Sequence, residues 1–445
     1  MLIRYDRGTI LIRGNLRVPN STWDPRVEAF RTLALHYPDV IRFLRNSHID
    51  FKDNVLDLPP CPKLKAKTKL RDYQKEALNA WLRTGKRGII VLPTGAGKTV
   101  VAMAAISHVD APTIVIVPTI DLLEQWRINL TEEFAVHIGA YGGGENDLEA
   151  ITVSTYDSAY LRAEELGNRF TLVIFDEVHH LPAPSYRQIA ELFVAPFRLG
   201  LTATLVREDE AHKLLPQLIG NVVYELEAED LAGTHLSHYT LEKRLVNLRP
   251  DEQLDYDNNY RIFREYLRKK RIKLISSQDF RRFIMKTGTD PEARKALLAR
   301  NRALHIALNA SSKIDALRSL LSQNRAEKAL IFTHHNELVY RISREFLIPA
   351  VTHQTSKEER SEILDKFKSG VYTKVVTSRV LDEGIDVPDA TLGVILSGSG
   401  SSREFIQRLG RLLRKREGKR ARLVEIVSKE TREVKISQRR RRWES

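Results

Sequence analysis

Apolar and polar positions follow two different periods along this chain, and the change of period divides it into segments. From Leu70 to about Leu226, short apolar runs of strand length are separated by stretches with helical spacing. A second region with the same alternation follows a basic block that ends near Leu304. Such alternation is typical of a parallel sheet covered by helices, so we predict two α/β lobes with a cleft between them. The predicted strands are Ile89 to Leu92, Ile114 to Val117, Ile151 to Val153, Leu172 to Phe175, Phe197 to Leu201, Ala329 to Phe332, Lys374 to Thr377, Leu392 to Leu396 and Leu423 to Val427.

The first 67 residues form a small separate segment with a different pattern. Leu2 to Tyr5 and Thr9 to Ile12 flank the turn sequence Asp-Arg-Gly, which predicts a β-hairpin. Helical spacing occurs in Pro25 to Leu35 and again in Val40 to Arg45. The three prolines within Leu58 to Pro62 prevent regular pairing, so we interpret this stretch as a linker.

Positive charge is concentrated in two places. Between Arg261 and Leu304 there are 14 Lys and Arg residues against 4 Asp and Glu, and from Arg411 to Ser445 there are 14 against 5. The first block has helical periodicity and lies between the two α/β regions, so we predict a helical insertion that follows a nucleic-acid backbone. A solvated helical hairpin kept soluble by its charge is the alternative. The expected segments are residues 1–67, 68–232, 233–310 and 311–445, and the expected DNA contacts in the insertion are Arg268, Lys269 and Lys270.

Bulk composition narrows the class of protein. The 445 residues are 42% hydrophobic, enough for several cores, and the net charge of +14 favours a polyanionic partner or a membrane surface. The apolar runs have only strand length, and charge interrupts the first residues, so neither a membrane span nor a signal peptide is expected. Cys61 is the single cysteine, which excludes internal disulfides, cysteine-based zinc sites and iron–sulfur clusters. A cytoplasmic location is expected.

The run LPTGAGKT, from Leu92 to Thr99, lies between a predicted strand and a predicted helix. A glycine-rich turn at a helix start lets backbone N–H groups converge on phosphate oxygens. Lys98 would reach the β- and γ-phosphates of a nucleotide, and Thr99 would coordinate Mg²⁺. The strict pattern has glycine at position 92, so this run alone is not decisive. The residues expected to surround the phosphates are Thr94, Gly95, Ala96, Gly97, Lys98 and Thr99.

The run LVIFDEVHH, from Leu172 to His180, is an apolar strand that ends in two carboxylates. Asp176 suits the outer shell of Mg²⁺, and Glu177 suits the ordering or deprotonation of an attacking water. A glycine turn and a charged strand end are each unremarkable, but the ordered pair predicts an ATP site. Upstream, the side chain of Gln74 offers the donor and acceptor that adenine needs, although a glutamine at a helix start is often only polar surface.

Small hydroxyl residues follow the strand that ends at Leu201. Thr202 and Thr204 could hydrogen-bond to His179 and relay the state of the nucleotide, while a satisfied buried histidine is the alternative. The His179-His180 and His334-His335 pairs lack cysteine or carboxylate partners at the usual zinc spacing, so zinc is disfavoured.

The second lobe carries the sequence QRLGRLLR, which begins at Gln407. Arg411 and Arg414 are three residues apart on a predicted helix and share a face, so both could reach a γ-phosphate bound across the cleft. Such arginine fingers stabilise transition-state charge and make hydrolysis depend on closure of two lobes. A surface salt-bridge face is the alternative. In the preceding loop, Gly384 permits close backbone approach to a strand or nucleotide, and Asp386 could bind a ribose hydroxyl, unless this is a simple turn.

Taken in order, LRDYQ, LPTGAGKT, IVPTIDLLEQW, VSTYDS, DEVHH, LTAT, SRVLDEGIDVP and QRLGRLLR resemble the motif series of superfamily 2 helicases over residues 70–427. The triplet Arg207-Glu208-Asp209 just after LTAT is similar to that of the xeroderma pigmentosum group B (XPB) helicase family in its compact archaeal form. This resemblance implies two RecA-like parallel-sheet domains with an α-helical basic thumb insertion and a small N-terminal α+β domain for damage recognition. The family's triplet is implicated in strand separation, and its QRLGRLLR helix, with Gln407, contributes to the nucleotide site.

The resemblance also implies an activity and partners. They are ATP- and Mg²⁺-dependent opening of DNA with 3′-5′ polarity in nucleotide excision repair, a structure-specific endonuclease partner, and a prokaryotic, nucleoid-associated setting. Two other hypotheses remain open. One is an ATP-gated scaffold that bends damaged DNA and recruits a nuclease. The other is an RNA helicase, which the sequence DEVH in place of DEAD makes less favoured. Lesion preference, processivity and oligomeric state do not follow from the sequence.

Overall fold

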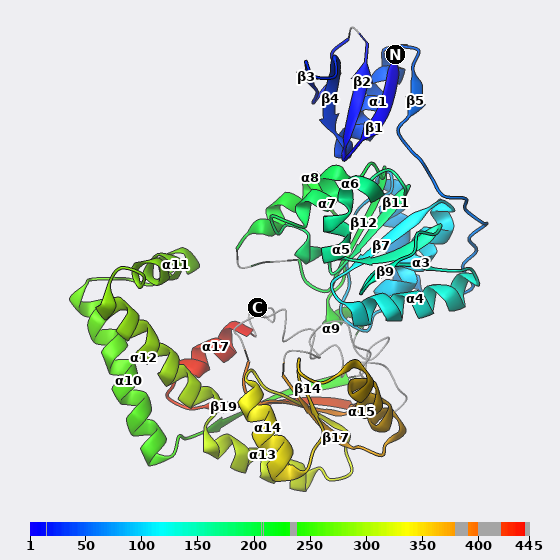
Figure 1. Ribbon diagram of the computed structural model, residues 1–445. Helices are drawn as coiled ribbons and strands as arrows, with labels where there is room; N and C mark the ends of the chain where they lie inside the picture. The colour runs from blue at the N-terminus through cyan, green and yellow to red at the C-terminus, as the bar shows by residue number, and fades with distance from the viewer. Residues whose placement is uncertain are drawn as a thin grey trace. The chain divides into compact units, whose positions relative to one another are not determined.

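The computed structural model describes residues 1–14, 16–205, 207, 209–231, 238–378, 390–398 and 420–440. The chain divides into two compact units, Met1–Asp230 and Leu231–Ser445, and the predicted α/β class is confirmed in both (Figure 1). None of the helices in the described part combines the length and apolar composition needed to span a bilayer.

The N-terminal module is a five-stranded sheet with one helix against it, so the α+β prediction holds. Its strand order is β3-β4-β2-β1-β5, antiparallel except for the β1/β5 pair. Ile3, Ile10 and Ile12 from the sheet pack with Val40 and Leu44 of the helix in one core. The elements are β1 (Leu2–Asp6), β2 (Thr9–Arg13), β3 (Thr22–Asp24), β4 (Ala29–Leu33), η1 (Ala34–His36), α1 (Tyr37–Asn46) and β5 (Lys52–Asn54).

The prediction of a helix over residues 25–35 is wrong, because this stretch forms a turn and then strand β4. Asp24 causes the turn: its carboxylate accepts hydrogen bonds from the backbone N–H and the guanidinium of Arg26 and from Arg31 of β4. These local bonds compete with helix formation. The second expected helix, over residues 40–45, lies inside α1.

The N-terminal module is docked on the first lobe through specific hydrogen bonds. The hydroxyl of Tyr5 lies 3.0 Å from the carbonyl oxygen of Glu164 and 3.3 Å from that of Leu192. Val194 of the lobe belongs to the buried cluster of the module. The following segment, residues 55–71, has no regular element, as predicted for a linker, but Glu133 of the lobe accepts hydrogen bonds from the backbone N–H groups of Lys67 and Thr68. Module, linker and lobe therefore form one body.

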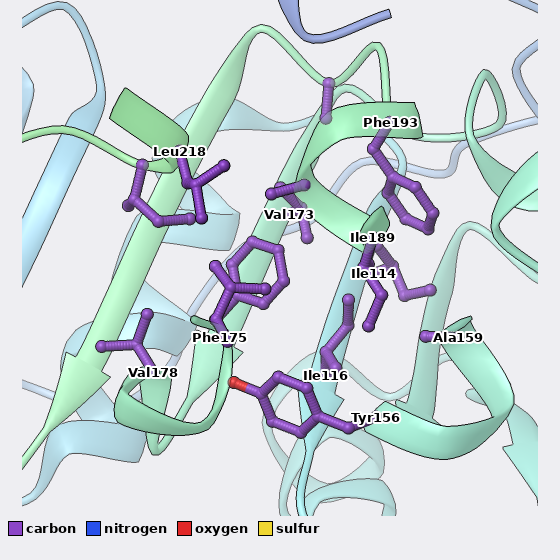
Figure 2. Close-up of a cluster of buried hydrophobic side chains, with 14 of the residues drawn as sticks. Ile114, Ile116, Tyr156, Ala159, Val173, Phe175, Val178, Ile189, Phe193 and Leu218 are labelled. Atoms are coloured by element: carbon purple, nitrogen blue, oxygen red, sulfur yellow. The ribbon is translucent and has the colours of Figure 1, made fainter. Parts of the chain in front are cut away.

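The first lobe contains a sheet with the order β13-β6-β12-β11-β7-β10-β8-β9, parallel except for the β8/β9 pair. Its interior is apolar: Ile116, Val173 and Phe175 of the sheet pack against Ile189 and Phe193 (Figure 2). The elements are α2 (Asp72–Arg83), β6 (Arg87–Val91), α3 (Lys98–Val109), β7 (Thr113–Val117), α4 (Ile120–Phe134), β8 (Gly139–Gly142), β9 (Glu145–Asn146), β10 (Ile151–Thr155), α5 (Tyr156–Leu161), α6 (Ala163–Leu166), β11 (Leu172–Asp176), η2 (Val178–His180), α7 (Arg187–Leu192), β12 (Phe197–Thr202), η3 (Ala211–Leu214), α8 (Leu215–Leu218), β13 (Val222–Glu225) and α9 (Ala228–Leu231).

The second unit contains a parallel sheet with the order β14-β19-β18-β15-β17-β16. The segment expected to be linker and insertion, residues 233–310, thus contains a strand of this sheet, β14. The elements are β14 (His238–Val246), α13 (Ser311–Gln323), β15 (Ala329–Phe332), α14 (Asn336–Phe346), β16 (Ala350–Val351), α15 (Lys357–Ser369), β17 (Lys374–Thr377), β18 (Leu392–Ile395), β19 (Arg420–Ser428) and α17 (Arg432–Arg440).

The basic insertion is helical, as predicted, and projects from the second sheet (Figure 1). It consists of α10 (Pro250–Lys269), α11 (Ser277–Lys286) and α12 (Pro291–Leu308), which we call the thumb. Small side chains on one face of α12 let α10 approach closely, and α11 adds Phe283 to a core with Phe263 and Tyr266. The small buried residues of α12 are Ala293, Ala296, Ala299, Ala303 and Ala307.

Candidate active site

The glycine-rich run forms the loop between β6 and α3, at the carboxyl end of β6. Gly97 caps α3 in the left-handed conformation, with φ of 79°. Lys98 and Thr99 open the helix, and the ammonium group of Lys98 donates to the carbonyl oxygen of Leu92 at 3.2 Å. The first N–H groups of α3 therefore point out of the loop, where an anion is stabilised by the helix terminus. Thr94, Gly95 and Ala96 form the remainder of this loop.

Two side chains of α2 hold the loop in place from behind. Gln74 donates from Nε2 to the carbonyl oxygen of Ala96 at 2.9 Å, and its Oε1 accepts from the N–H of Arg71 at 2.9 Å. Tyr73 donates its hydroxyl to the same Ala96 oxygen at 2.7 Å. A Cβ atom on Gly97 would lie 2.5 Å from Nε2 of Gln74. Gln74 thus supports the phosphate loop in this structure, and its contact with adenine stays a prediction.

Asp176 lies at the carboxyl end of β11, beside the loop. Its Oδ2 accepts a hydrogen bond from the indole N–H of Trp126 at 2.8 Å, and its Oδ1 accepts from the N–H of Glu177 at 3.0 Å. Burial raises the pKa of Asp176, and the nearby positive charge of Lys98 opposes this rise. The fold therefore brings together the lysine and the carboxylate that the sequence separates.

These groups fit Mg²⁺ and a triphosphate. Magnesium prefers hard oxygen ligands and is usually held by one or two protein groups plus phosphate oxygens and waters. The Asp176 carboxylate and the Thr99 hydroxyl supply such oxygens. Each carboxylate oxygen has two lone pairs, so the bonds from Trp126 and the Glu177 N–H leave capacity for a metal or its waters.

The next residues connect the carboxylates to the strand end of β12. Oε2 of Glu177 lies 3.4 Å from Nδ1 of the buried His179, and this nitrogen lies 3.1 Å from the hydroxyl oxygen of Thr202. Thr202 donates to the carbonyl oxygen of Thr204 at 2.8 Å. Of the three residues expected to form a relay, His179 and Thr202 are joined as predicted and also reach Glu177, whereas Thr204 takes part only through its backbone, since its hydroxyl has no hydrogen-bond partner among the described residues.

The relay continues to the charged triplet. One guanidinium nitrogen of Arg207 donates to the carbonyl oxygen of His179, and two others form a bidentate pair with Asp209 at 2.8 and 2.9 Å. This pair holds the pKa of the Asp209 carboxyl well below its usual range. Glu208, between them, lies outside the described residues.

The remaining predicted residues fall in the second unit. Arg268, Lys269 and Lys270 are exposed at the end of α10, and both lysines lie close to Glu292, at 2.9 and 3.7 Å. The nucleotide contacts expected from the second lobe are not tested by the structure. Gly384, Asp386, Gln407, Arg411 and Arg414 all lie outside the described residues.

Sequence reasoning missed three aromatic residues that position this site. Trp126, Tyr73 and Tyr156 each donate a hydrogen bond to a site residue; the Tyr156 hydroxyl lies 3.1 Å from the carbonyl oxygen of Asp176. The available signal was the placement of Trp126 within the run IVPTIDLLEQW, where an amphipathic ring follows a predicted strand.

Comparisons with known proteins agree with this geometry. Residues 67–207 match the model of the type III restriction enzyme res subunit, residues 312–416 the helicase conserved C-terminal domain, and residues 3–55 the xeroderma pigmentosum group B helicase damage recognition domain. The two helicase matches correspond to two RecA-like domains. The solved helicase domain of Hef from Pyrococcus furiosus has the same fold, with a TM-score of 0.53 and 20% identity over 83% of this chain and 97% of that one.

Full-length relatives extend the match to almost the whole chain. The DNA 3′-5′ translocase XPB2 of Sulfurisphaera tokodaii is 47% identical over 99% of this chain and 99% of its own length. The DNA 3′-5′ helicase XPB of Mycobacterium tuberculosis is 30% identical over 84% of this chain and 63% of its own. The resemblance inferred from the motifs is thereby confirmed: this chain belongs to the XPB family of superfamily 2 helicases.

Proposed function

We propose that this protein is an ATP-dependent DNA translocase that opens duplex DNA with 3′-5′ polarity in nucleotide excision repair. The observation that carries the proposal is the meeting of Lys98, on the phosphate loop, with Asp176 and Glu177 at the end of β11. Relatives that match 99% and 84% of this chain are named as a DNA translocase and a DNA helicase, which supports DNA as the polyanion.

The residues divide the work as follows. The N–H groups of the loop and Lys98 would bind the β- and γ-phosphates, and Asp176 and Thr99 would hold Mg²⁺, which would supply neutralisation of phosphate charge when bound. Glu177 orients the attacking water and accepts its proton. His179 and Thr202 contact Glu177 and lead to Arg207, so loss of the γ-phosphate is transmitted toward the triplet.

The second lobe completes the cycle in this proposal. Arg411 and Arg414 stabilise charge on the γ-phosphate, Gln407 and Asp386 contact the nucleotide, and Gly384 allows close approach of the backbone. The N-terminal module recognises distorted DNA, because it matches the damage recognition domain of the family. A structure-specific endonuclease partner and a cytoplasmic, nucleoid-associated location belong to the same proposal.

The test is steady-state ATPase activity of the full chain with no nucleic acid, single-stranded DNA, forked DNA, duplex DNA and RNA. We expect stimulation by DNA and not by RNA, and loss of hydrolysis in Lys98→Ala with DNA binding retained. Lys63→Ala, on the exposed linker, is the matched control and should hydrolyse ATP normally. Hydrolysis by Lys98→Ala would contradict the site. Strand displacement on the forked substrate separates a helicase from an ATP-gated scaffold, since a scaffold would hydrolyse ATP without displacing the strand.

A further inference from the structure

All the exposed charged side chains that the structure describes on helix α17 are cationic. Arg432, Lys435 and Arg439 are spaced three and four residues apart, so they share one stripe of the helix, and all three are exposed. Among the described residues, none of these cations forms an ion pair with a carboxylate. An outer helix face that serves only solubility usually carries both signs of charge.

The single acidic residue of α17 is turned inward. Glu433 is buried, and its carboxylate pairs with the buried ammonium group of Lys313 at 2.6 and 2.7 Å and accepts the N–H of Ser428 at 2.9 Å. This pair fixes α17 against α13 and the end of β19. The one negative charge of the helix is therefore neutralised in the interior, and the charged side chains described on its exposed face are positive.

The same face continues onto the thumb. α17 packs against α12, beside which it lies in Figure 1, and the N–H of Arg432 donates to the hydroxyl of Tyr256 on α10 at 2.8 Å. On α12, Arg300 lies over the ring of Phe280, 4.6 Å from its centroid. Burial lowers the pKa of Arg300, and the positive charges of Arg432 and Arg439 lower it further, so Arg300 lies within electrostatic range of both.

We propose that Arg432, Lys435 and Arg439 of α17, with Arg300 of α12, form a phosphate-binding surface for the DNA backbone at the base of the thumb. A phosphate placed near Arg300, Arg432 and Arg439 offsets the repulsion of Arg300 by the other two. Because Tyr256, Lys313 and Phe280 already hold the helices and one guanidinium in place, little ordering entropy is lost on binding. The inference rests on the proposed function, since it adds a contact surface for the same DNA.

The first test is the salt dependence of binding to a 30-base-pair duplex, measured with the full-length triple variant Arg432→Gln, Lys435→Gln, Arg439→Gln. Each lost phosphate contact should reduce the slope of log K against log[salt] by about 0.9, so the slope should fall by roughly 2 to 3. The matched control is Lys63→Gln, Lys65→Gln, Lys69→Gln, which removes three exposed charges from the linker. Its slope should stay close to that of the unaltered protein.

The second test measures directly whether Lys435 contacts DNA. Lys435 should react with an acetylating N-hydroxysuccinimide ester in the free protein and be protected several-fold when duplex DNA is bound, as measured by mass spectrometry. Thermal unfolding of the triple variant, expected within a few degrees of the unaltered protein, shows that the neutral side chains leave the fold intact.

The outcomes separate this surface from the proposed function. DNA-stimulated ATPase in the unaltered protein, together with an unchanged slope in the triple variant and no protection of Lys435, would overturn the surface and leave the function standing. Equal slope changes in both triple variants would overturn it as well, because the effect would then be one of net charge. Protection by RNA or by polyglutamate equal to that by DNA would also contradict a DNA surface. Absence of any DNA binding by the unaltered protein would overturn both proposals.

Discussion

The indole N–H of Trp126 donates to Oδ2 of Asp176 at 2.8 Å, so a ring on α4 supports the carboxylate that we assign to Mg²⁺. Burial raises the pKa of Asp176, and the Trp126 hydrogen bond lowers it by stabilising the charged form. Mg²⁺ requires the carboxylate, so ATPase activity should fall as pH drops through this raised pKa. Trp126→Phe removes the donor and raises the pKa further.

The acid limb of kcat/KM for Mg-ATP should therefore move to higher pH in Trp126→Phe. The measurement is a pH profile of ATPase activity for both proteins at constant ionic strength. Leu130→Ala, which removes a buried apolar side chain from the same helix, controls for altered packing and should leave the position of the limb unchanged. If the acid limb lies at the same pH in Trp126→Phe and in the unaltered protein, the hydrogen bond from Trp126 does not control the ionisation of Asp176.

Gly97→Ala should weaken ATP binding by at least about 10-fold. Two effects combine: φ of 79° is left-handed, which costs a residue with a Cβ roughly 1–2 kcal/mol, and the new Cβ would lie 2.5 Å from Nε2 of Gln74. Gly85→Ala is the control for the same backbone strain outside the phosphate loop, because Gly85 has φ of 72° and a Cβ added there would meet no atom within 4 Å, so ATP affinity should be unchanged. Titration with a fluorescent ATP analogue measures the nucleotide affinity of both variants. Equal affinities would mean that the phosphate loop tolerates displacement of Gln74.

Arg207→Lys should reduce DNA-stimulated ATPase activity and strand displacement on the order of 10-fold. A lysine keeps the positive charge but cannot pair bidentately with Asp209 while also reaching the carbonyl oxygen of His179. The relay from Glu177 would then end at His179. Asp209→Asn is the companion variant and should have a smaller effect, because the bond from Arg207 to His179 remains. If Arg207→Lys lowers DNA-free and DNA-stimulated rates by the same factor, the residue acts on hydrolysis itself and not on coupling.

Tyr5→Phe should loosen the N-terminal module from the first lobe. It removes a hydroxyl that contacts the partly or fully solvent-accessible carbonyl oxygens of Leu192 and Glu164, and an ordinary hydrogen bond of this kind contributes about 0.5–1.5 kcal/mol. Denaturant unfolding should show that loss, and limited proteolysis should cut the linker near residues 58–63 sooner. Tyr37→Phe is the control, since its hydroxyl bonds to Asp53 at an exposed position within the module. Equal behaviour of the two variants would contradict a docking role for Tyr5.

The apolar strands were predictable because fully buried parallel strands are continuous apolar runs. Residues 329–332 and 374–377 were bounded correctly, and the strand that carries Asp176 was predicted from its true first residue but ended one residue too early. The strand β14 was missed because its sequence HYTLEKRLV mixes charged and apolar residues, and only pairing with β19 along its full length makes it part of the sheet. Long-range pairing of this kind leaves no signal in a local pattern.

Buried polar groups were equally hidden from sequence reasoning. Arg198 is fully buried on β12, where its guanidinium donates to four backbone carbonyl groups, among them those of Ala190 and Phe193. Composition predicts an exposed arginine, and only the fold supplies the acceptors. The motif residues of the first lobe were found because their spacing reflects the chemistry of phosphate binding. The roles of Trp126 and Tyr5 depend on contacts between segments far apart in the chain.

Glu292 should weaken DNA binding by the thumb, because its carboxylate forms an ion pair with Lys269. The carboxylate oxygens lie 2.9 Å from Nζ of Lys269 and 3.7 Å from Nζ of Lys270. Arg268, beside them, forms no ion pair within the described residues and is exposed. Arg268→Gln should therefore reduce the slope of log K against log[salt] by about 0.9, the value for one lost phosphate contact. Lys269→Gln should reduce it less, since a phosphate must first displace Glu292.

Glu292→Gln gives the opposite result and so provides the sharper test. Removing the carboxylate frees both lysines, and duplex affinity at moderate salt should rise several-fold with a steeper slope. Asp257→Asn, on the exposed surface of the neighbouring helix α10 and without a lysine partner among the described residues, removes the same charge and serves as the control. An equal gain in both variants would reflect net charge alone. No gain in Glu292→Gln, with no loss in Arg268→Gln, would show that the end of α10 does not touch the DNA backbone.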